Sequence, residues 1–460
     1  MKIKNLNLIH KNTLNFLFIF FPLTFILGNL FVNIQILLIS IIGFFYYKKK
    51  LFDFKKNQLL VFIAIFFLII ILTTILENLL NSNNGNILKS FLYLRYFILL
   101  LVLRSMVISR ELNFNKLFLS CLVFSCLVAG DIIFQYFAGF NILGFESANA
   151  YKNSGLFGDE RIAGGYIQRF CILGFFAIPL FLNKKNLKSY LIYFILITLC
   201  FFGILLSGNR MPTVMFLIFL FLAPLVWGLK KFNYTVIISF FIIVFLSVLI
   251  SNNQSLQSRY NSFIDGIPSF TEINDELKRE YPEFTKYKNS GKAFYQTETF
   301  EKNKENIFII SKYSGHTVIF ITSIDIFNDS PFLGRGIKSF RYTCLEKKHL
   351  PNRMCENHAH NFYLGILNDV GIIGFFFLMV TIACSIFVVL YNLGYKQKKD
   401  IKSFKLFFNA ILLCLILEFF PFRSHGDFFS TVNSAYIFFL IGILLGLYEL
   451  KFKKRFKKIF

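Results

Sequence analysis

Long apolar runs separated by short polar segments recur along most of the chain. Runs near the length that a helix needs to cross the bilayer core predict about twelve transmembrane helices, at 13–31, 32–46, 58–77, 87–106, 116–138, 166–183, 189–206, 211–228, 233–250, 370–391, 404–421 and 433–450. One long polar interruption covers 251–369. The pattern therefore predicts an all-α integral membrane protein: helices 1–9 in 1–250, a large loop at 251–369, and helices 10–12 with a basic tail in 370–460.

Composition and charge agree with this class. Only 16% of the 460 residues are charged, against about a quarter in soluble domains. The formal net charge of +24 comes from clusters in alternate loops, such as 48–56, 184–188, 396–405 and 451–458. If both termini are cytoplasmic, every cluster lies on the cytoplasmic side, as the positive-inside rule requires. Membrane topology thus explains the positive net charge. We therefore expect membrane lipids as partners, and no nucleic acid.

The long outer loop carries two local signals. Apolar residues recur at helical spacing from 316 to 328, which predicts an amphipathic helix over the membrane, ended by Asp329-Ser330-Pro331. Cys344 and Cys355 also lie in this loop, whereas the other cysteines lie in spans. An oxidising compartment permits a disulfide between them, with two free thiols as the alternative.

Polar residues also occur within the predicted spans, where hydrocarbon makes them costly. They fall in the outer halves of their helices and predict a water-accessible cavity that opens outward; the alternative is that each reaches the interface separately. The residues are Arg95, Asp131, Gln135, Gln168, Arg169 and Glu418.

Four polar constellations lie on the outer side. Ser207–Arg210 is a tight hinge whose guanidinium suits a phosphate, although a lone arginine also anchors helices to lipid headgroups. A glycine-rich stretch over 155–166 contains Arg161, and 423–427 includes Arg423 and His425 as polar lining. The pair His358 and His360 is the fourth.

A His-x-His pair can bind a metal, but the nearby loops supply no carboxylate or thiolate set with metal-ligand spacing. We therefore expect no metal and no cofactor. A histidine at the mouth of an apolar pocket instead suits a general base.

The element around His360 resembles a known family. His360-Asn361, nine residues and then Gly371-x-x-Gly374 resembles the His-Asn-x9-Gly-x-x-Gly pattern of bacterial O-antigen ligases and related polymerases. The stretch 329–336 is similar to that family's N-P-hydrophobic-hydrophobic-G-x-G element, and 207–210 to its Ser-Gly-Ser-Arg hinge. The resemblance covers about 90–440.

The resemblance implies a GT-C-type glycosyltransferase of the bacterial inner membrane, with its active site facing the periplasm. It would transfer a glycan from undecaprenyl pyrophosphate to a sugar hydroxyl of lipid A-core. His360 is then the expected base and Arg210 the leading pyrophosphate ligand. Further substrate-binding candidates are Arg161, Arg259, His316, Arg335, His358, Asn361, Arg423 and His425. His316 departs from the family, because many relatives have an arginine there.

Three other functions compete with ligation. An O-antigen polymerase uses the same donor with a second lipid-linked glycan as the acceptor. A polysaccharide transporter is disfavoured because the chain lacks repeat symmetry, and a structural scaffold does not explain the one-sided polar cluster. No phosphate-binding Gly-Lys-Ser/Thr loop is present, so ATP hydrolysis is not expected.

Overall fold

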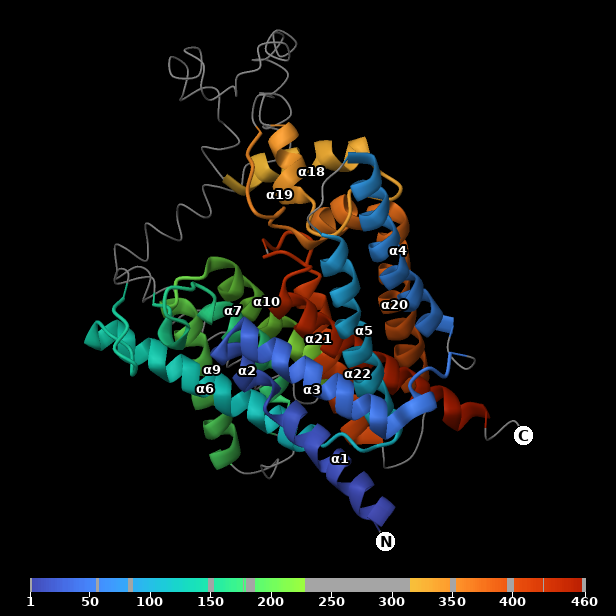
Figure 1. Cartoon of the computed structure of the whole chain (residues 1–460). Helices are drawn as coiled ribbons and strands as arrows, with labels where there is room; N and C mark the ends of the chain where they lie inside the picture. Colours follow the sequence, from blue (N-terminus) through green and yellow to red (C-terminus); the bar gives the residue numbers. More distant parts are fainter. Residues whose placement is uncertain are drawn as a thin grey trace.

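The computed structural model is built from helices (Figure 1). It describes residues 2–54, 58–81, 86–147, 153–176, 178, 187–227, 315–347, 353–394, 401–424 and 426–456. Within these ranges the only β-type pairing is an isolated bridge between Phe140 and Glu146. The all-α prediction is therefore confirmed for the described part of the chain.

Most helices follow the predicted apolar runs, but the predicted span 13–31 is divided between two helices that end at Ile19 and Leu27. The described helices are α1 (Lys2–Ile19), α2 (Phe21–Leu27), α3 (Asn29–Tyr47), α4 (Gln58–Asn81), α5 (Ile87–Ile108), α6 (Phe114–Ala138), α7 (Ala163–Phe175), α9 (Leu187–Leu206), α10 (Arg210–Trp227), α18 (Gly315–Asp329), α19 (Phe340–Glu346), α20 (Phe362–Gly394), α21 (Ile401–Glu418) and α22 (Thr431–Phe456), with short 3₁₀ turns at Lys48–Lys50 and Gly155–Phe157.

Six of the described helices are long and apolar enough to cross a membrane, and α1 with α2 forms a seventh candidate bent by 52°. Leu191–Leu206 and Arg210–Ala223 are shorter apolar helices. The chain is thus a multi-pass membrane protein. The predicted span 233–250 lies outside the described residues, so the number twelve and the cytoplasmic termini stay predictions.

Helix α22 forms the centre of the bundle. Of its membrane-spanning window, 83% is buried inside the protein, against 33% for α20. A helix that is apolar all round is buried rather than exposed on one face. It packs along α5, where a Cβ at Gly446 would lie 2.5 Å from Cβ of Val107, and one at Gly442 would lie 3.0 Å from the carbonyl oxygen of Leu100. Small residues four positions apart therefore let these two helices approach closely.

A buried ion pair joins the same two helices near the end of α22. Arg104 donates from Nε to Oε1 of Glu449 at 2.5 Å and from Nη2 to Oε2 at 2.9 Å. Its Nη1 donates to the carbonyl of Leu51 at 3.3 Å, which also ties the loop after α3 to this point.

Breaking this pair is expected to be costly because it leaves a buried charge without its partner. We predict that Glu449→Ala lowers the free energy of unfolding by about 3–5 kcal/mol, whereas replacing Arg104 and Glu449 together by methionine costs far less. Thermal unfolding of the purified protein in detergent measures both. Equal losses in the two variants would contradict the prediction.

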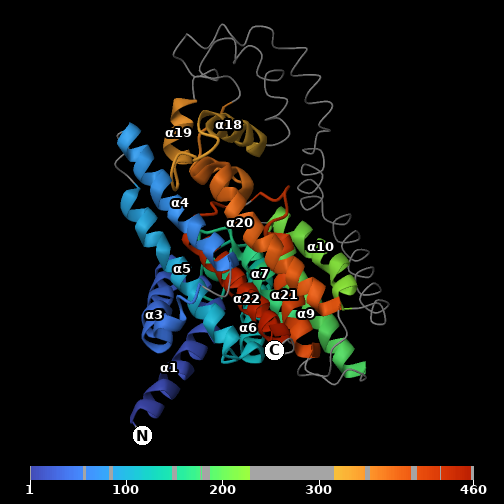
Figure 2. The ribbon, with the colours of Figure 1, turned by 90° about the vertical axis from the view of Figure 1, so that its right-hand side faces the viewer.

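A separate layer, α18 and α19, covers the ends of α4 and α20 (Figures 1 and 2). Helix α18 is the amphipathic helix predicted over 316–328, and it ends at Asp329 as predicted. The N-terminus and the end of α22 lie toward the opposite end of the molecule (Figure 2). Chain topology thus places α18, α19 and the start of α20 together, far from the termini.

Candidate functional site

A break in α20 creates the framework of the site. Gly371 has φ 63° and ψ −172°, which interrupts the helix. In an unbroken helix the amides of Ile372 and Ile373 would donate to the carbonyls of Asn368 and Asp369. The break leaves all of these backbone groups without their helical partners, and buried backbone groups must find others.

The segment after α18 supplies those partners. The amides of Arg335 and Gly336 donate to the carbonyls of Asn368 and Asp369 at 2.7 and 2.9 Å. In return, the amides of Ile372 and Ile373 donate to the carbonyls of Pro331 and Phe332 at 2.8 and 3.3 Å. The stretch 331–336 therefore replaces the hydrogen bonds that the break in α20 removes.

Two glycines make this exchange sterically feasible. A Cβ at Gly371 would lie 2.2 Å from the carbonyl oxygen of Phe332. A Cβ at Gly334, which has φ 73°, would lie 2.6 Å from the backbone of Asp369 and Gly371. The two sequence elements that resemble the ligase family, around 329–336 and 360–374, thus interlock. Gly334 of the first lies against the backbone of the second, and Gly371 of the second lies against the backbone of the first.

The carboxylate of Asp369 connects α20 to the turn directly before α19. It is buried and accepts hydrogen bonds from the amide of Lys338 at 2.6 Å, from the amide of Ser339 at 3.2 Å, and from the Ser339 hydroxyl at 2.9 Å. Lys338 has φ 58°, which is unusual for a residue with a side chain. Asp369 therefore fixes the turn that leads into α19.

The histidine pair lies directly before α20. The ring centroids of His358 and His360 are 4.0 Å apart, and His360 has φ 53°. Asn361 caps the helix, because its Oδ1 accepts from the amides of Tyr363 and Leu364 at 2.9 and 3.3 Å. Its Nδ2 donates to the carbonyl of Pro421 at 2.9 Å. Asn361 thus fixes the position of His360 and ties it to the loop between α21 and α22.

A group of charged side chains surrounds Asp427 in that loop. Burial raises the pKa of Asp427, and the positive charges of Lys338, His358 and Arg341 oppose this shift. Burial lowers the pKa of Lys338, which Asp427 partly offsets, and lowers the pKa of His358. These four residues, here called the Asp427 cluster, therefore interact electrostatically beside His360.

The Ser207–Arg210 hinge lies against the start of α7. Asn209 accepts from the amide of Gly164 at 3.0 Å and donates from Nδ2 to the carbonyl of Arg161 at 3.0 Å. A Cβ at Gly164 would lie 2.3 Å from Oγ of Ser207. The fold thus brings together the glycine-rich stretch and the hinge, and with them the backbones of Arg161 and Arg210.

A buried charge network connects α7 with the end of α21. Arg169 donates to both carboxylate oxygens of Glu418 at 2.9 Å, and Arg423 donates to Oε1 of Glu418 at 2.8 Å. Arg169 also donates to Asn433 at 2.7 Å. Through this network and the bond from Asn361 to Pro421, α7 and α20 are both attached to the loop that holds Asp427.

Three of the other polar residues predicted to line an outward cavity have structural partners. Asp131 accepts from the amide of Ile142 at 2.9 Å, and Gln135 accepts from the amide of Gly155 at 2.8 Å. Arg95 donates to the hydroxyl of Tyr96 at 2.9 Å. These contacts account for Asp131, Gln135 and Arg95, whereas the side-chain oxygen of Gln168 is buried without a hydrogen-bond partner among the described residues. The outward cavity therefore stays a prediction.

Several predicted substrate-binding residues have other partners in the structure. Arg335 donates to Glu77 at 3.3 Å and to Asp329 at 3.4 Å, and Arg423 belongs to the network around Glu418. Arg259 and His425 lie outside the described residues, as does the side chain of His316. Among the described residues, no group of three or more His, Cys, Asp or Glu side chains is arranged to hold a metal ion.

Sequence reasoning did not select Lys338, Arg341 or Asp369. The sequence places the first two only a few residues after Gly336, but their approach to His358 depends on the interlocked backbone. Asp427 was included in the polar loop 423–427 without a role of its own.

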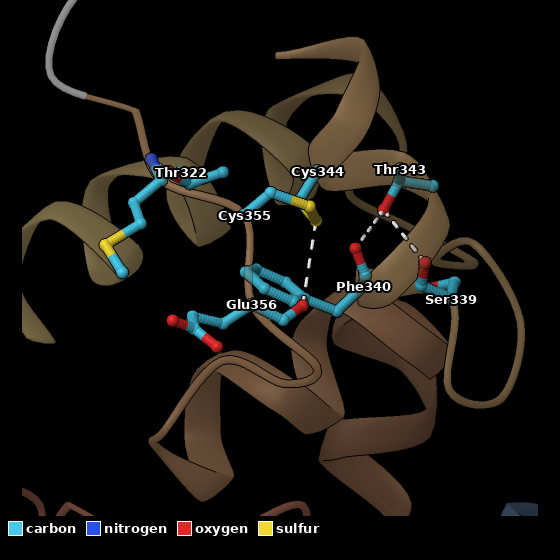
Figure 3. Close-up of a disulfide and its surroundings, with 8 residues drawn as sticks. Thr322, Ser339, Phe340, Thr343, Cys344, Cys355 and Glu356 are labelled. Atoms are coloured by element: carbon cyan, nitrogen blue, oxygen red, sulfur yellow. Dashed lines mark hydrogen bonds between the residues drawn. A yellow bond between two sulfur atoms is a disulfide. The ribbon is translucent and has the colours of Figure 1, made fainter. Parts of the chain in front are cut away.

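Cys344 of α19 and Cys355 form a disulfide, with Cα atoms 5.1 Å apart (Figure 3). The bridge joins the helix that carries Arg341 to the segment that leads to His358. On the other side, the amide of Met354 donates to the hydroxyl of Thr322 in α18 at 3.1 Å. The disulfide thus joins the two segments of the outer layer that carry Arg341 and His358 of the Asp427 cluster.

Removing the bridge is expected to loosen this layer. A disulfide across a sequence separation of 11 residues contributes about 2–3 kcal/mol. We predict that Cys344→Ser/Cys355→Ser unfolds at lower temperature, while membrane insertion is unchanged. The mass shift on alkylation, with and without reductant, tests the bridge itself. Two thiols that react without reductant in protein from an oxidising compartment would contradict it.

Comparison with known proteins gives one family. No curated protein matches the chain. A family model described as O-Antigen ligase matches residues 194–379, which include the hinge at Arg210, the interlocked segment, and the histidine pair with the break in α20. The resemblance seen in the sequence is thereby confirmed over residues 194–379, where this multi-pass membrane protein matches the O-antigen ligase family model.

Proposed function

We propose that the chain is a membrane glycosyltransferase that transfers a glycan from undecaprenyl pyrophosphate to a sugar hydroxyl on the periplasmic face of the inner membrane. The acceptor is lipid A-core, so the reaction is O-antigen ligation. The observation that carries this proposal is the family match over residues 194–379. It is supported by the position of His360, which directly precedes the Asn361 cap of α20 and adjoins a group of basic side chains.

The chemistry needs one base and stabilisation of a leaving anion. The acceptor oxygen forms a bond to the anomeric carbon while the bond from that carbon to the pyrophosphate oxygen breaks. The acceptor proton passes to an imidazole nitrogen of His360, and the electron pair leaves with the pyrophosphate. Direct displacement inverts the anomeric centre. General-base catalysis of this kind contributes about 10²–10⁴-fold.

Arg210 is the proposed ligand of the pyrophosphate, with Arg161 beside it. A guanidinium offers a planar pair of donors that matches phosphate oxygens, and fixed cations stabilise developing charge without reorganisation. The bonds from Asn209 to Gly164 and to Arg161 hold the hinge in place, which supports a preorganised site. Arg335 and Arg423 are weaker candidates because carboxylates already engage their guanidinium groups.

A deletion strain examined by lipopolysaccharide gel tests the function. Loss of all long chains, with lipid-linked polymer accumulating, is the result expected for a ligase. Loss of chain length with single-repeat caps retained would instead identify the polymerase, which uses the same donor. An unchanged ladder would contradict both.

A further inference from the structure

The basic side chains of the outer layer fall into two groups. One group is paired with carboxylates. Arg335 lies within ion-pair distance of Glu77 and Asp329, Lys347 of Asp329, and Arg353 of Asp325. Lys338 and Arg341 have no such partner among the described residues, although both lie in the same layer. Nε of Arg341 is buried and lacks a hydrogen-bond partner in the described part of the chain; the same is true of Nε of Arg335, but the other two guanidinium nitrogens of Arg335 are paired.

Leaving a buried donor such as Nε of Arg341 without a partner is costly, although Lys338 and Arg341 are otherwise only partly buried. A buried polar group without a hydrogen bond costs about 1–3 kcal/mol, and more when it is charged. Asp427 is the main acidic neighbour, but it faces Lys338, Arg341 and His358 together. Lys89 at the start of α5 adds a further positive charge near Lys338. Asp369 and Glu356 are further acidic neighbours, of Lys338 and His358 respectively. Lys338 and Arg341 nevertheless have no carboxylate within ion-pair distance among the described residues, which leaves them able to pair with an anionic ligand.

The backbone also holds these two residues in place. Asp369 fixes the Lys338–Ser339 turn through the three hydrogen bonds described above, and α19 begins at Phe340. The disulfide at Cys344 attaches the same helix to the segment before His358. Two cations on a fixed backbone, without an ion-pair partner among the described residues, match a phosphoryl group, which carries more than one negative charge and several acceptor oxygens.

We propose that Lys338 and Arg341 form a phosphoryl-binding site beside His358 and His360, in addition to the hinge at Arg210. The site rests on the proposed function for the source of its ligand, which is the pyrophosphate of the polyprenyl donor or a phosphate on the lipid A-core acceptor.

Direct binding tests this site without measuring transfer. The purified full-length protein in detergent is titrated with undecaprenyl pyrophosphate and with undecaprenol, and separately with phosphorylated and dephosphorylated lipid A-core. The variants are Lys338→Met and Arg341→Met, which keep the length of the stem but remove the charge. Lys347→Met is the matched control, because it removes the same charge at the end of α19 where Asp329 already pairs it.

We expect Lys338→Met and Arg341→Met to bind one phosphorylated ligand at least tenfold more weakly, while undecaprenol binding and the control are unchanged. Weaker binding of undecaprenyl pyrophosphate identifies the donor as the source, and weaker binding of phosphorylated lipid A-core identifies the acceptor. Lys338→Arg and Arg341→Lys are expected to restore part of the affinity, which a purely structural role would not predict.

Wild-type affinity of both methionine variants for both phosphorylated ligands would overturn the site, as would an equal loss in the control. A wild-type protein that binds phosphoryl groups through these residues but transfers no glycan would contradict the proposed function and leave the site intact. The two failures are therefore distinguishable.

Discussion

Replacing His360 with alanine is expected to lower glycan transfer by about two to four orders of magnitude, while the protein inserts and folds normally. The imidazole is the proposed acceptor of the proton, and alanine leaves no group to replace it. Asn361, which caps α20, is unchanged in this variant, so the helix start and its bond to Pro421 are retained. Transfer to a fluorescent acceptor in vesicles, with thermal unfolding measured on the same protein, gives both quantities.

His358→Ala is the matched control for this prediction, because it removes the neighbouring imidazole 4.0 Å away. We expect it to weaken substrate binding more than it lowers the maximal rate, since its proposed role is to line the site. Full transfer by His360→Ala, or an equal loss of maximal rate in both variants, would show that His360 is not the base.

The second large effect is expected for Gly371→Val. This position has φ 63°, so a β-branched side chain adds strain of about 1–3 kcal/mol. Its Cβ would also lie 2.2 Å from the carbonyl oxygen of Phe332. The segment 331–336 must then move away and lose hydrogen bonds worth about 1 kcal/mol each. We expect transfer to fall to background and the outer layer to become sensitive to protease, while the helices of the bundle remain inserted.

Gly365→Ala provides the control on the same helix. A Cβ there meets nothing within 4 Å, and alanine in a helix interior is favoured over glycine by about 0.5–1 kcal/mol. This variant should be as active and as stable as the wild type, or slightly more stable. A Gly371→Val protein with an intact, active outer layer would mean that the break in α20 is not required.

Part of this architecture was predictable because local patterns determine it. Helical spacing and the Asp329-Ser330-Pro331 stop located α18 closely. Apolar runs located most helices of the bundle, since length and hydropathy are properties of a single segment. The His360-Asn361 element was also visible as a motif, but the role of Asn361 as a helix cap became clear only from its contacts with Tyr363 and Pro421.

Contacts between distant segments were not predictable in this way. Arg335 and Arg423 were selected as substrate ligands because an arginine on the outer side suits a phosphate. The partner of Arg335, Glu77, lies 258 residues away in the sequence. The partner of Arg423, Glu418, is only five residues away, but Glu418 also binds Arg169 of α7, and that contact depends on the fold. Lys338 was overlooked for the same reason, since its position depends on Asp369, which is 31 residues further along the chain.

The most direct measurement of the central claim is release of the carrier. Purified protein in vesicles is given a glycan linked to radiolabelled undecaprenyl pyrophosphate together with lipid A-core, and the free undecaprenyl pyrophosphate is counted against the glycan joined to the acceptor. One molecule of carrier released for each glycan joined, and neither product formed by His360→Ala, is the predicted result. No release by the wild-type protein with both substrates present would contradict the assignment as a glycosyltransferase.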